Sequence, residues 1–161
     1  MIQPDRRMTA DRFTAVPLDP RRIDQAYPVV QAVMPDIAAA EWRGYAASLL
    51  GRDDRGIMVL QDPAGYLHGL FAYAAVPHLG RGRVLRIECF VALGLLDRDG
   101  PAAALLRAAE DVARRLGCRA VQTETPEVER ANGGYRDWLF ARLRRAGHLP
   151  GPPQYSKPLN A

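Results

Sequence analysis

The chain has 161 residues, of which 48% are hydrophobic and 25% charged, and its formal net charge is +4. This length and composition are those of one globular domain with its own core, so an intrinsically disordered chain is excluded. Two cysteines, Cys89 and Cys118, are too few for a disulfide framework, and no apolar run reaches the roughly 20 residues of a membrane span.

The positive charge is almost entirely arginine, because Lys157 is the single lysine. The arginines are scattered along the sequence and form no stripe, so charge alone favours an anionic small molecule as readily as nucleic acid. We therefore expect no nucleic-acid partner. Residues 1–12 are expected to form a polar tail without a signal peptide, ahead of one domain over residues 13–161. A cytoplasmic location without membrane partners is expected.

The N-terminal part of the domain predicts one strand and two helices. Alternating apolar residues predict a strand over residues 13–18. Asp19 before Pro20 is typical of a helix start, with an N-cap residue followed by proline in the first turn. Pro28 is expected to kink or break that helix. A second amphipathic helix is predicted over residues 38–50.

The middle of the chain predicts a meander of strands and then a long helix. Residues 56–61 and 66–76 are predicted strands joined by a turn that contains proline and glycine in favoured places. A further strand is predicted over residues 84–93. Apolar residues at helical spacing then predict a helix over residues 101–116.

The C-terminal part predicts a strand over residues 119–125, a helix over residues 135–146 and a short final strand over residues 155–159. The predicted order is therefore β-α-α-β-β-β-α-β-α-β. An antiparallel meander followed by one crossover helix predicts an α/β (α+β) fold with a mixed, mostly antiparallel central sheet flanked by helices.

The segment that enters the long central helix is suited to an anion. It reads Asp97-Arg98-Asp99-Gly100-Pro101-Ala102. A helix N-terminus offers backbone N–H groups and a partial positive charge, and small residues let a phosphate come close. Two aspartates oppose an anion there, so an ordinary helix start without a ligand remains the alternative.

Glu88 is the second candidate, because it interrupts an otherwise apolar strand over residues 86–92. Burying a carboxylate is costly unless it is paired or lines a cleft, and burial would raise its pKa toward the range useful for proton transfer. A salt bridge with Arg86 is the alternative explanation. No cluster of His and Cys has the spacing of metal ligands, so no metal site is expected.

The element order, the loop and Glu88 together resemble the GNAT superfamily of acyl-CoA-dependent N-acetyltransferases, over about residues 13–159. The resemblance implies acetyl-CoA, or another acyl-CoA, as the acyl donor. Its pantetheine arm would lie on backbone groups near Phe90, Val91 and Ala92. The diphosphate would lie at the start of the long helix, on Arg98, Asp99, Gly100, Ala102 and Ala103. The family often has an Asn after the fifth strand, and Asn132 matches it as a further cofactor residue.

The resemblance also implies catalytic roles. Glu88 matches a carboxylate that acts as general base, often through water. The family often has a Tyr that protonates the departing thiolate one helical turn before a Gly-Phe pair. Here that position holds Leu143, and Tyr135 is the substitute candidate. Asp97 also departs from the family pattern, because it stands where Arg or Gln is usual.

The predicted function is transfer of an acetyl group from acyl-CoA to a small-molecule or peptide amine by direct attack. The alternative is a catalytically impaired GNAT-like domain that binds acyl-CoA or a protein partner. GNAT-like domains often pair, so a homodimer remains open, although no residue demands one.

Overall fold

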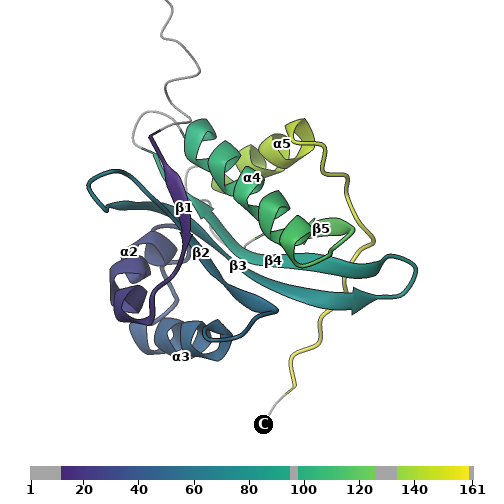
Figure 1. Ribbon diagram of the computed structural model, residues 1–161, viewed down its shortest axis with the longest axis horizontal. Helices are drawn as coiled ribbons and strands as arrows, with labels where there is room; N and C mark the ends of the chain where they lie inside the picture. The colour runs from purple at the N-terminus through teal and green to yellow at the C-terminus, as the bar shows by residue number, and fades with distance from the viewer. Residues whose placement is uncertain (1–11, 95–97, 126–133, 160–161) are drawn as a thin grey trace, which may run out of the picture.

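The structure is a computed structural model that describes residues 12–94, 98–125 and 134–159. Its centre is one five-stranded sheet in the order β1-β2-β3-β4-β5 (Figure 1). The first four strands pair antiparallel, and β5 pairs parallel to β4. This confirms the predicted mixed, mostly antiparallel sheet. The strands are β1 Thr14–Pro17, β2 Arg55–Gln61, β3 Leu67–His78, β4 Gly82–Ala92 and β5 Ala120–Thr123.

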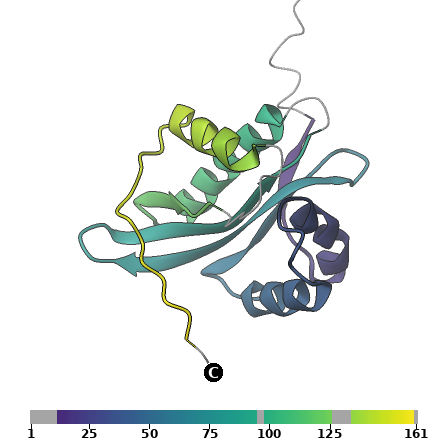
Figure 2. The same ribbon diagram turned by 180° about the vertical axis from the view of Figure 1, so that it is seen from behind.

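Helices cover both sides of the sheet. On one side lie α2, Ile23–Val33, and α3, Ala39–Leu49. On the other side lie α4, Asp99–Arg115, and α5, Tyr135–Arg145 (Figures 1 and 2). A single 3-10 turn, η1, Pro20–Arg22, precedes α2, and the Asp19 side chain caps it as predicted by accepting from the N–H of Arg21.

The helix α2 continues through Pro28, where a kink or break was expected. Proline has no N–H to offer the carbonyl of Asp24, so one bond of the helix ladder is lost. The helix persists because its apolar side is anchored in the core: Ala26, Val30 and Val33 are at most 2% exposed. Burial of that face outweighs the missing bond.

The core is built around the middle strands and α4. The apolar face of α4 packs across all five strands, and Leu105 and Ala109 are almost completely buried. Phe71 of β3 stacks on Phe90 of β4, with ring centroids 6.4 Å apart. The end of β4, including Phe90, is therefore part of the hydrophobic core.

The predicted final strand is wrong. After α5, the described residues up to 159 contain no strand, and Tyr155 and Leu159 are 95% and 86% exposed. Prolines at positions 150, 152, 153 and 158 explain the difference, because proline cannot donate to a strand ladder. The segment runs past the β3–β4 hairpin along the outside of the molecule (Figure 2).

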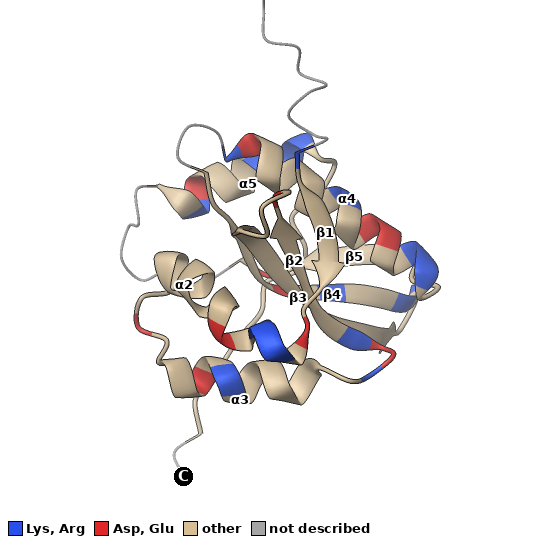
Figure 3. Cartoon of the chain, turned by 60° about the vertical axis from the view of Figure 1, so that its left-hand side comes forward, with Lys and Arg blue, Asp and Glu red and all other residues tan. Residues whose placement is uncertain are grey.

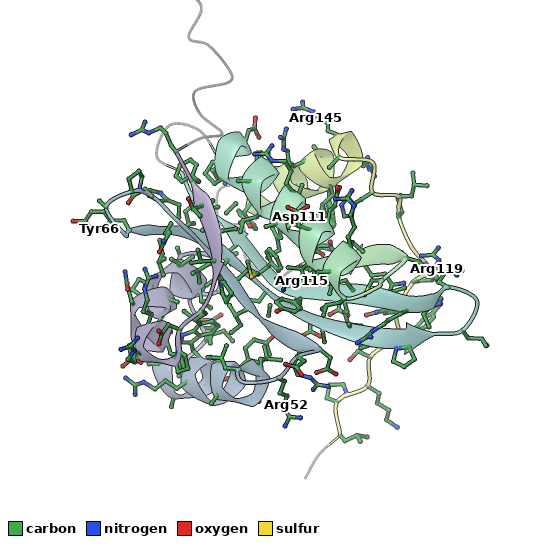
Figure 4. The ribbon with its side chains drawn as sticks, in the orientation of Figure 1. Arg52, Tyr66, Asp111, Arg115, Arg119 and Arg145 are labelled. Atoms are coloured by element: carbon green, nitrogen blue, oxygen red, sulfur yellow. The ribbon has the colours of Figure 1, made fainter. Side chains whose placement is uncertain are left out.

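Charged residues are dispersed over the surface. Figure 3 shows basic and acidic positions interspersed on the helices and on the long hairpin. The labelled side chains of Arg52, Arg119 and Arg145 lie at three separate edges of the molecule (Figure 4). No continuous basic stripe of the kind that follows a nucleic-acid backbone is seen in these views.

None of the helices in the described parts of the chain is long and apolar enough to cross a membrane.

Gly69 is the glycine whose replacement should disturb this core most. A Cβ built there would lie 2.5 Å from the carbonyl oxygen of Val91 and 2.8 Å from a methyl of Leu105. We expect Gly69→Ala to lower the free energy of unfolding by about 2–3 kcal/mol, because β4 and the side chain of Leu105 must move away from the added methyl group.

The matched control is Gly44→Ala on α3, where an added Cβ meets nothing within 4 Å. There the same chemical change should raise the free energy of unfolding by about 0.5–1 kcal/mol through helix propensity. Urea denaturation of both variants measures the difference. Equal effects at the two positions would contradict the packing described for β3, β4 and α4.

Candidate active site

The site begins where β4 and β5 part. Their parallel pairing runs from Val84 with Ala120 to Ile87 with Thr123, and the N–H of Glu124 still donates to the carbonyl of Ile87 at 2.9 Å. Beyond that point β4 continues to Ala92, whereas β5 has ended. Among the described parts of the chain, the last five residues of β4 therefore have β3 on one side and no strand on the other.

A bulge in β4 lies just beyond Ile87, where β4 and β5 separate; this place is called the parting below. Leu70 pairs with Val91 and Ala72 with Glu88, so the single residue Phe71 on β3 opposes two residues on β4. Cys89, one of these two, has φ 51°, the only positive value among the described residues other than glycine. Such a conformation costs about 1–3 kcal/mol and persists only where the surroundings impose it.

The bulge changes which backbone groups face the parting. In a regular strand, alternate residues after Ile87 would turn their N–H and C=O groups to the β5 side. The extra residue of the bulge shifts this alternation of backbone groups by one residue. Phe90 and Ala92 now present their groups there, and the N–H of Leu93 points the other way, to the carbonyl of His68 at 2.8 Å.

Tyr135, the first residue of α5, satisfies one group of each of these two residues. Its hydroxyl donates to the carbonyl of Phe90 at 2.9 Å and accepts from the N–H of Ala92 at 3.1 Å. The side chain is 3% exposed. Burial raises the pKa of Tyr135 to about 12, although the N–H of Ala92 works in the opposite direction. The hydroxyl therefore keeps its proton at neutral pH.

The predicted phosphate loop lies at the start of α4, which begins at Asp99. Pro101 is thus the third residue of the helix and not the first as predicted, but it still lies in the turn whose N–H groups need no helical acceptor. The N–H of Ala102 is already bound to the carbonyl of Arg98 at 3.1 Å. Backbone donors for a phosphate would therefore come from residues 98–100.

Trp138 of α5 reaches this helix start. Its indole N–H donates to Asp99 Oδ1 at 3.0 Å, and the guanidinium carbon of Arg98 lies 4.9 Å from the centroid of its ring. The carboxylate of Asp99 would repel a phosphate, which is the main objection to a phosphate site here. The hydrogen bond from the indole partly offsets the negative charge of that carboxylate. Arg98 is placed beside the entry, with its charge over the aromatic face.

Glu88 projects on the other side of β4, toward α3. Its carboxylate accepts a hydrogen bond from the hydroxyl of Tyr45 at 3.0 Å. Burial, and next the charge of Glu88, raise the pKa of Tyr45. Tyr45 therefore remains a proton donor that orients the carboxylate. Trp42, one turn earlier in α3, is a core residue, with its indole N–H on the carbonyl of Ile23.

The alternative expected for Glu88 was a salt bridge with Arg86, but Arg86 lies near another carboxylate. The guanidinium of Arg86 lies 4.0 Å from the carboxylate of Glu124, just after β5, and both side chains are more than 40% exposed. An exposed pair at this distance contributes little to stability. The negative charge of Glu124 also contributes, as the smallest of the causes, to the raised pKa of Tyr45.

Other chemistries find little support in the described residues. Burial raises the pKa of the Cys89 thiol to about 12, which is opposite to what a thiolate nucleophile needs. Among residues 12–94, 98–125 and 134–159, no three His, Cys, Asp or Glu side chains group closely enough to hold a metal ion. The groups at the parting are thus two carboxylates, two tyrosines and backbone amides.

The structure brings most of the predicted residues to this region. Phe90, Val91 and Ala92 form the unpaired end of β4, and Tyr135 contacts it. The helix entry supplies Arg98, Asp99, Gly100, Ala102 and Ala103. Asn132 and Asp97 lie outside the described residues. Leu143, at the position where the family often has a Tyr, is a buried apolar residue of α5.

Sequence reasoning missed three features: the contact of Trp138 with Asp99, the place of Glu124, and the bulge. The Trp138 contact joins residues 39 apart, beyond the reach of any local pattern. The bulge has no sequence signal, because positive φ usually indicates Gly or Asn and here the residue is Cys89. The hydrogen bond of Tyr45 to Glu88 joins residues 43 apart and has no local signal either.

The hydroxyl of Tyr135 should make stability depend on alkaline pH. A raised pKa in the folded state adds stability that is complete below the unfolded value of about 10 and is lost as the pH rises toward about 12. At pH 8, Tyr135→Phe should lower the free energy of unfolding by about 1–3 kcal/mol, because Phe90 and Ala92 lose their partner.

Above pH 10 that difference between the two proteins should shrink. Guanidinium denaturation of both proteins at pH 8, 9, 10 and 11 measures it, and the comparison cancels the contributions of the other tyrosines. A difference that stays constant up to pH 11 would contradict the burial of this hydroxyl.

The comparison with known proteins is informative at the level of structure only. No protein-family model matches the sequence, and no curated protein matches it. The aminoglycoside N-acetyltransferase AAC(6')-Iy, solved with a bisubstrate analogue of CoA, is similar in structure with a TM-score of 0.75. It is 12% identical in sequence, over 92% of this chain and 99% of that one.

Two further structures give the same result. A ribosomal-protein-alanine N-acetyltransferase from Brucella melitensis is 16% identical over 91% of this chain and 99% of that one, with a TM-score of 0.69. A GNAT family acetyltransferase from Staphylococcus aureus is 14% identical over 92% and 99%, also with a TM-score of 0.69. At these identities the likeness is one of fold. The chain thus has the fold of the GNAT acetyltransferases.

Proposed function

We propose that this protein is an N-acetyltransferase that moves an acetyl group from acetyl-CoA, or a related acyl group from its CoA ester, to an amine. The observation that carries the proposal is the parting of β4 from β5 at the Cys89 bulge. It brings three things together: backbone groups on one edge of β4, the carboxylate of Glu88 on its α3 side, and the start of α4 beside its end.

The residues present suit a CoA ester. Its pantetheine arm carries amides, and Phe90 and Ala92 offer one carbonyl and one N–H toward the β5 side, the pattern with which a strand pairs an extended chain. Val91 lies between them. The helix entry of Gly100, Ala102 and Ala103 is lined by small residues that admit a diphosphate near the N–H groups of the first turn.

Arg98 supplies a positive charge at that entry, while Asp99 opposes the anion less strongly because the indole of Trp138 donates to it. Asn132 is proposed as a further contact of the cofactor on the resemblance alone. What acetyl-CoA supplies when bound is a thioester carbonyl, which a free amine can attack directly.

Glu88 is the proposed general base. It accepts the proton that the amine loses as the new C–N bond forms, either directly or through a water. Tyr45 holds the carboxylate in place by donating to one of its oxygens, at 3.0 Å. The N–H groups around the bulge are suited to polarise the carbonyl oxygen of the thioester.

Tyr135 is the proposed acid. Its hydroxyl keeps its proton at neutral pH, because burial raises its pKa to about 12. It therefore has a proton to give to the thiolate that leaves when the C–S bond breaks. The amine proton goes to Glu88 and the thiolate takes one from Tyr135, so direct transfer is balanced without a covalent enzyme intermediate. No described thiol is suited to form one, because burial is the leading cause that raises the pKa of both Cys89 and Cys118.

A second candidate is a domain that binds acyl-CoA or a protein partner without turnover. Leu143 at the family's tyrosine position supports it, because that residue is 7% exposed and offers no proton. The two candidates differ in one measurable product: an enzyme releases free CoA in the presence of a suitable small-molecule or peptide amine, and a binding domain does not.

The role of Glu88 is tested by Glu88→Gln, which keeps the hydrogen-bond acceptor for Tyr45 but removes the basic group. We expect release of free CoA to fall by about 10²–10⁴-fold at saturating amine, with acetyl-CoA binding within about twofold of the unmodified protein. A thiol-reactive dye follows free CoA, and calorimetry follows binding.

The matched control is Glu110→Gln on α4, where the carboxylate pairs with Arg114 on an exposed surface. It should leave turnover unchanged. If Glu88→Gln releases CoA as fast as Glu110→Gln does, Glu88 is not the base.

A further inference from the structure

Tyr135 and Trp138 stand one helical turn apart on α5 and make two separate contacts. Their ring centroids are 5.4 Å apart, so both side chains leave the helix on the same side. Tyr135 bonds to the backbone of β4, and Trp138 bonds to the first residue of α4. The first turn of α5 thus joins the two places at which the proposed acyl-CoA would be held.

At the first place, Tyr135 occupies a donor that cannot be shared. A backbone N–H has a single hydrogen, and that of Ala92 is directed to the tyrosine hydroxyl at 3.1 Å. The same hydroxyl donates to the carbonyl of Phe90. An amide of a pantetheine arm that accepts from Ala92 must displace the hydroxyl, because both acceptors require the same hydrogen.

At the second place, Trp138 covers Arg98 and Asp99. The guanidinium of Arg98 lies over the indole ring, 4.9 Å from its centroid, and the indole N–H is held by Asp99. A diphosphate that binds the in-plane N–H groups of Arg98 can leave the guanidinium stacked on the ring. It must, however, approach the carboxylate to which the indole is bound.

We infer that the first turn of α5 is a latch that acyl-CoA opens. This inference rests on the proposed function. Both contacts project from one turn of a rigid helix, so release of Tyr135 from β4 favours release of Trp138 from α4. The arm and the diphosphate therefore bind cooperatively. In the free protein, the hydrogen bonds of Tyr135 and Trp138 must break before acyl-CoA can bind.

The latch also gives Tyr135 a second function. While closed, it satisfies two buried backbone groups at the parting of β4 and β5. When open, the hydroxyl is released beside the end of the arm that carries the sulfur, where the proposed acid is needed. Tyr135 acts as a proton donor only after the cofactor has displaced it, which couples binding to the assembly of the site.

The test is calorimetric titration of acetyl-CoA into the unmodified protein, Tyr135→Phe and Trp138→Phe. Each variant keeps an aromatic ring but removes one hydrogen bond donor of the latch. We expect acetyl-CoA to bind Tyr135→Phe about threefold to tenfold more tightly, since the lost bond no longer opposes binding. Trp138→Phe should gain less, because Asp99 then lacks the indole donor and opposes the diphosphate more strongly. Phe140→Leu, on the same helix but with its ring against Arg136, is the matched control and should leave the affinity unchanged.

The outcomes separate this inference from the proposed function. If the unmodified protein binds acetyl-CoA and folded Tyr135→Phe binds it no more tightly, the latch is wrong and the proposed function stands. If none of the four proteins binds acetyl-CoA, the proposed function is wrong, and the latch is wrong with it.

A second readout does not depend on affinity. In the free protein, amide exchange of Ala92 followed by NMR should be slow and should become at least about tenfold faster in Tyr135→Phe. Thermal melts show whether Tyr135→Phe is folded, and Trp138→Phe tests the same latch without touching the backbone of β4. Exchange of Ala92 at equal rates in the two proteins would overturn the contact itself.

Discussion

On the side that faces β5, the end of β4 has to satisfy its backbone groups without a strand from the described residues, and much of the structure depends on how it does so. Buried N–H and C=O groups are almost always paired in folded proteins, because leaving one unpaired costs about 1–3 kcal/mol. β5 stops pairing at Ile87, yet Phe90 and Ala92, three and five residues later, are buried. The hydroxyl of Tyr135 satisfies both groups and thereby fixes where α5 begins.

The bulge at Cys89 makes this arrangement possible. Without the extra residue, β4 would turn different backbone groups to the parting, and the side chains beyond it would change faces. With it, the carboxylate of Glu88 points to α3 while the carbonyl of Phe90 faces Tyr135. Strained residues such as Cys89 are found most often at functional sites.

The two helices that follow β4 complete the arrangement. The start of α4 lies beside the end of β4, and α5 lies against both through Tyr135 and Trp138. In this fold, the elements that close the core are also those that would hold a long, partly anionic ligand. Packing and binding are therefore linked, and a ligand that uses the backbone of β4 must alter contacts that stabilise the free protein.

The sequence predicts the local elements well because their signals are local. The apolar spacing of α4 and the proline and glycine between β2 and β3, with Gly65 at φ 87°, are sufficient to place a helix and a hairpin. The final strand over residues 155–159 was predicted wrongly, because the prolines around residue 155 oppose a strand ladder. Glu88 was identifiable because a carboxylate in an apolar strand needs an explanation.

The contacts that build the site join residues far apart in sequence. Tyr135 and Phe90 are 45 residues apart, and Tyr45 and Glu88 are 43 apart. Nothing in the local pattern around Tyr135 distinguishes a core aromatic from one whose hydroxyl bridges a strand edge. The positive φ of Cys89 is imposed by the pairing of β3 with β4, which only the folded structure shows.

The most direct test of the account is whether acetyl-CoA binds with its diphosphate at the start of α4. Calorimetric titration should be carried out on the unmodified protein, on Gly100→Glu and on Arg107→Gln, an equal change of charge at an exposed position farther along α4. Acetyl-CoA should bind the unmodified protein and Arg107→Gln alike, and should bind Gly100→Glu at least about tenfold more weakly. Equal affinity for all three proteins, or no binding by any, would contradict it.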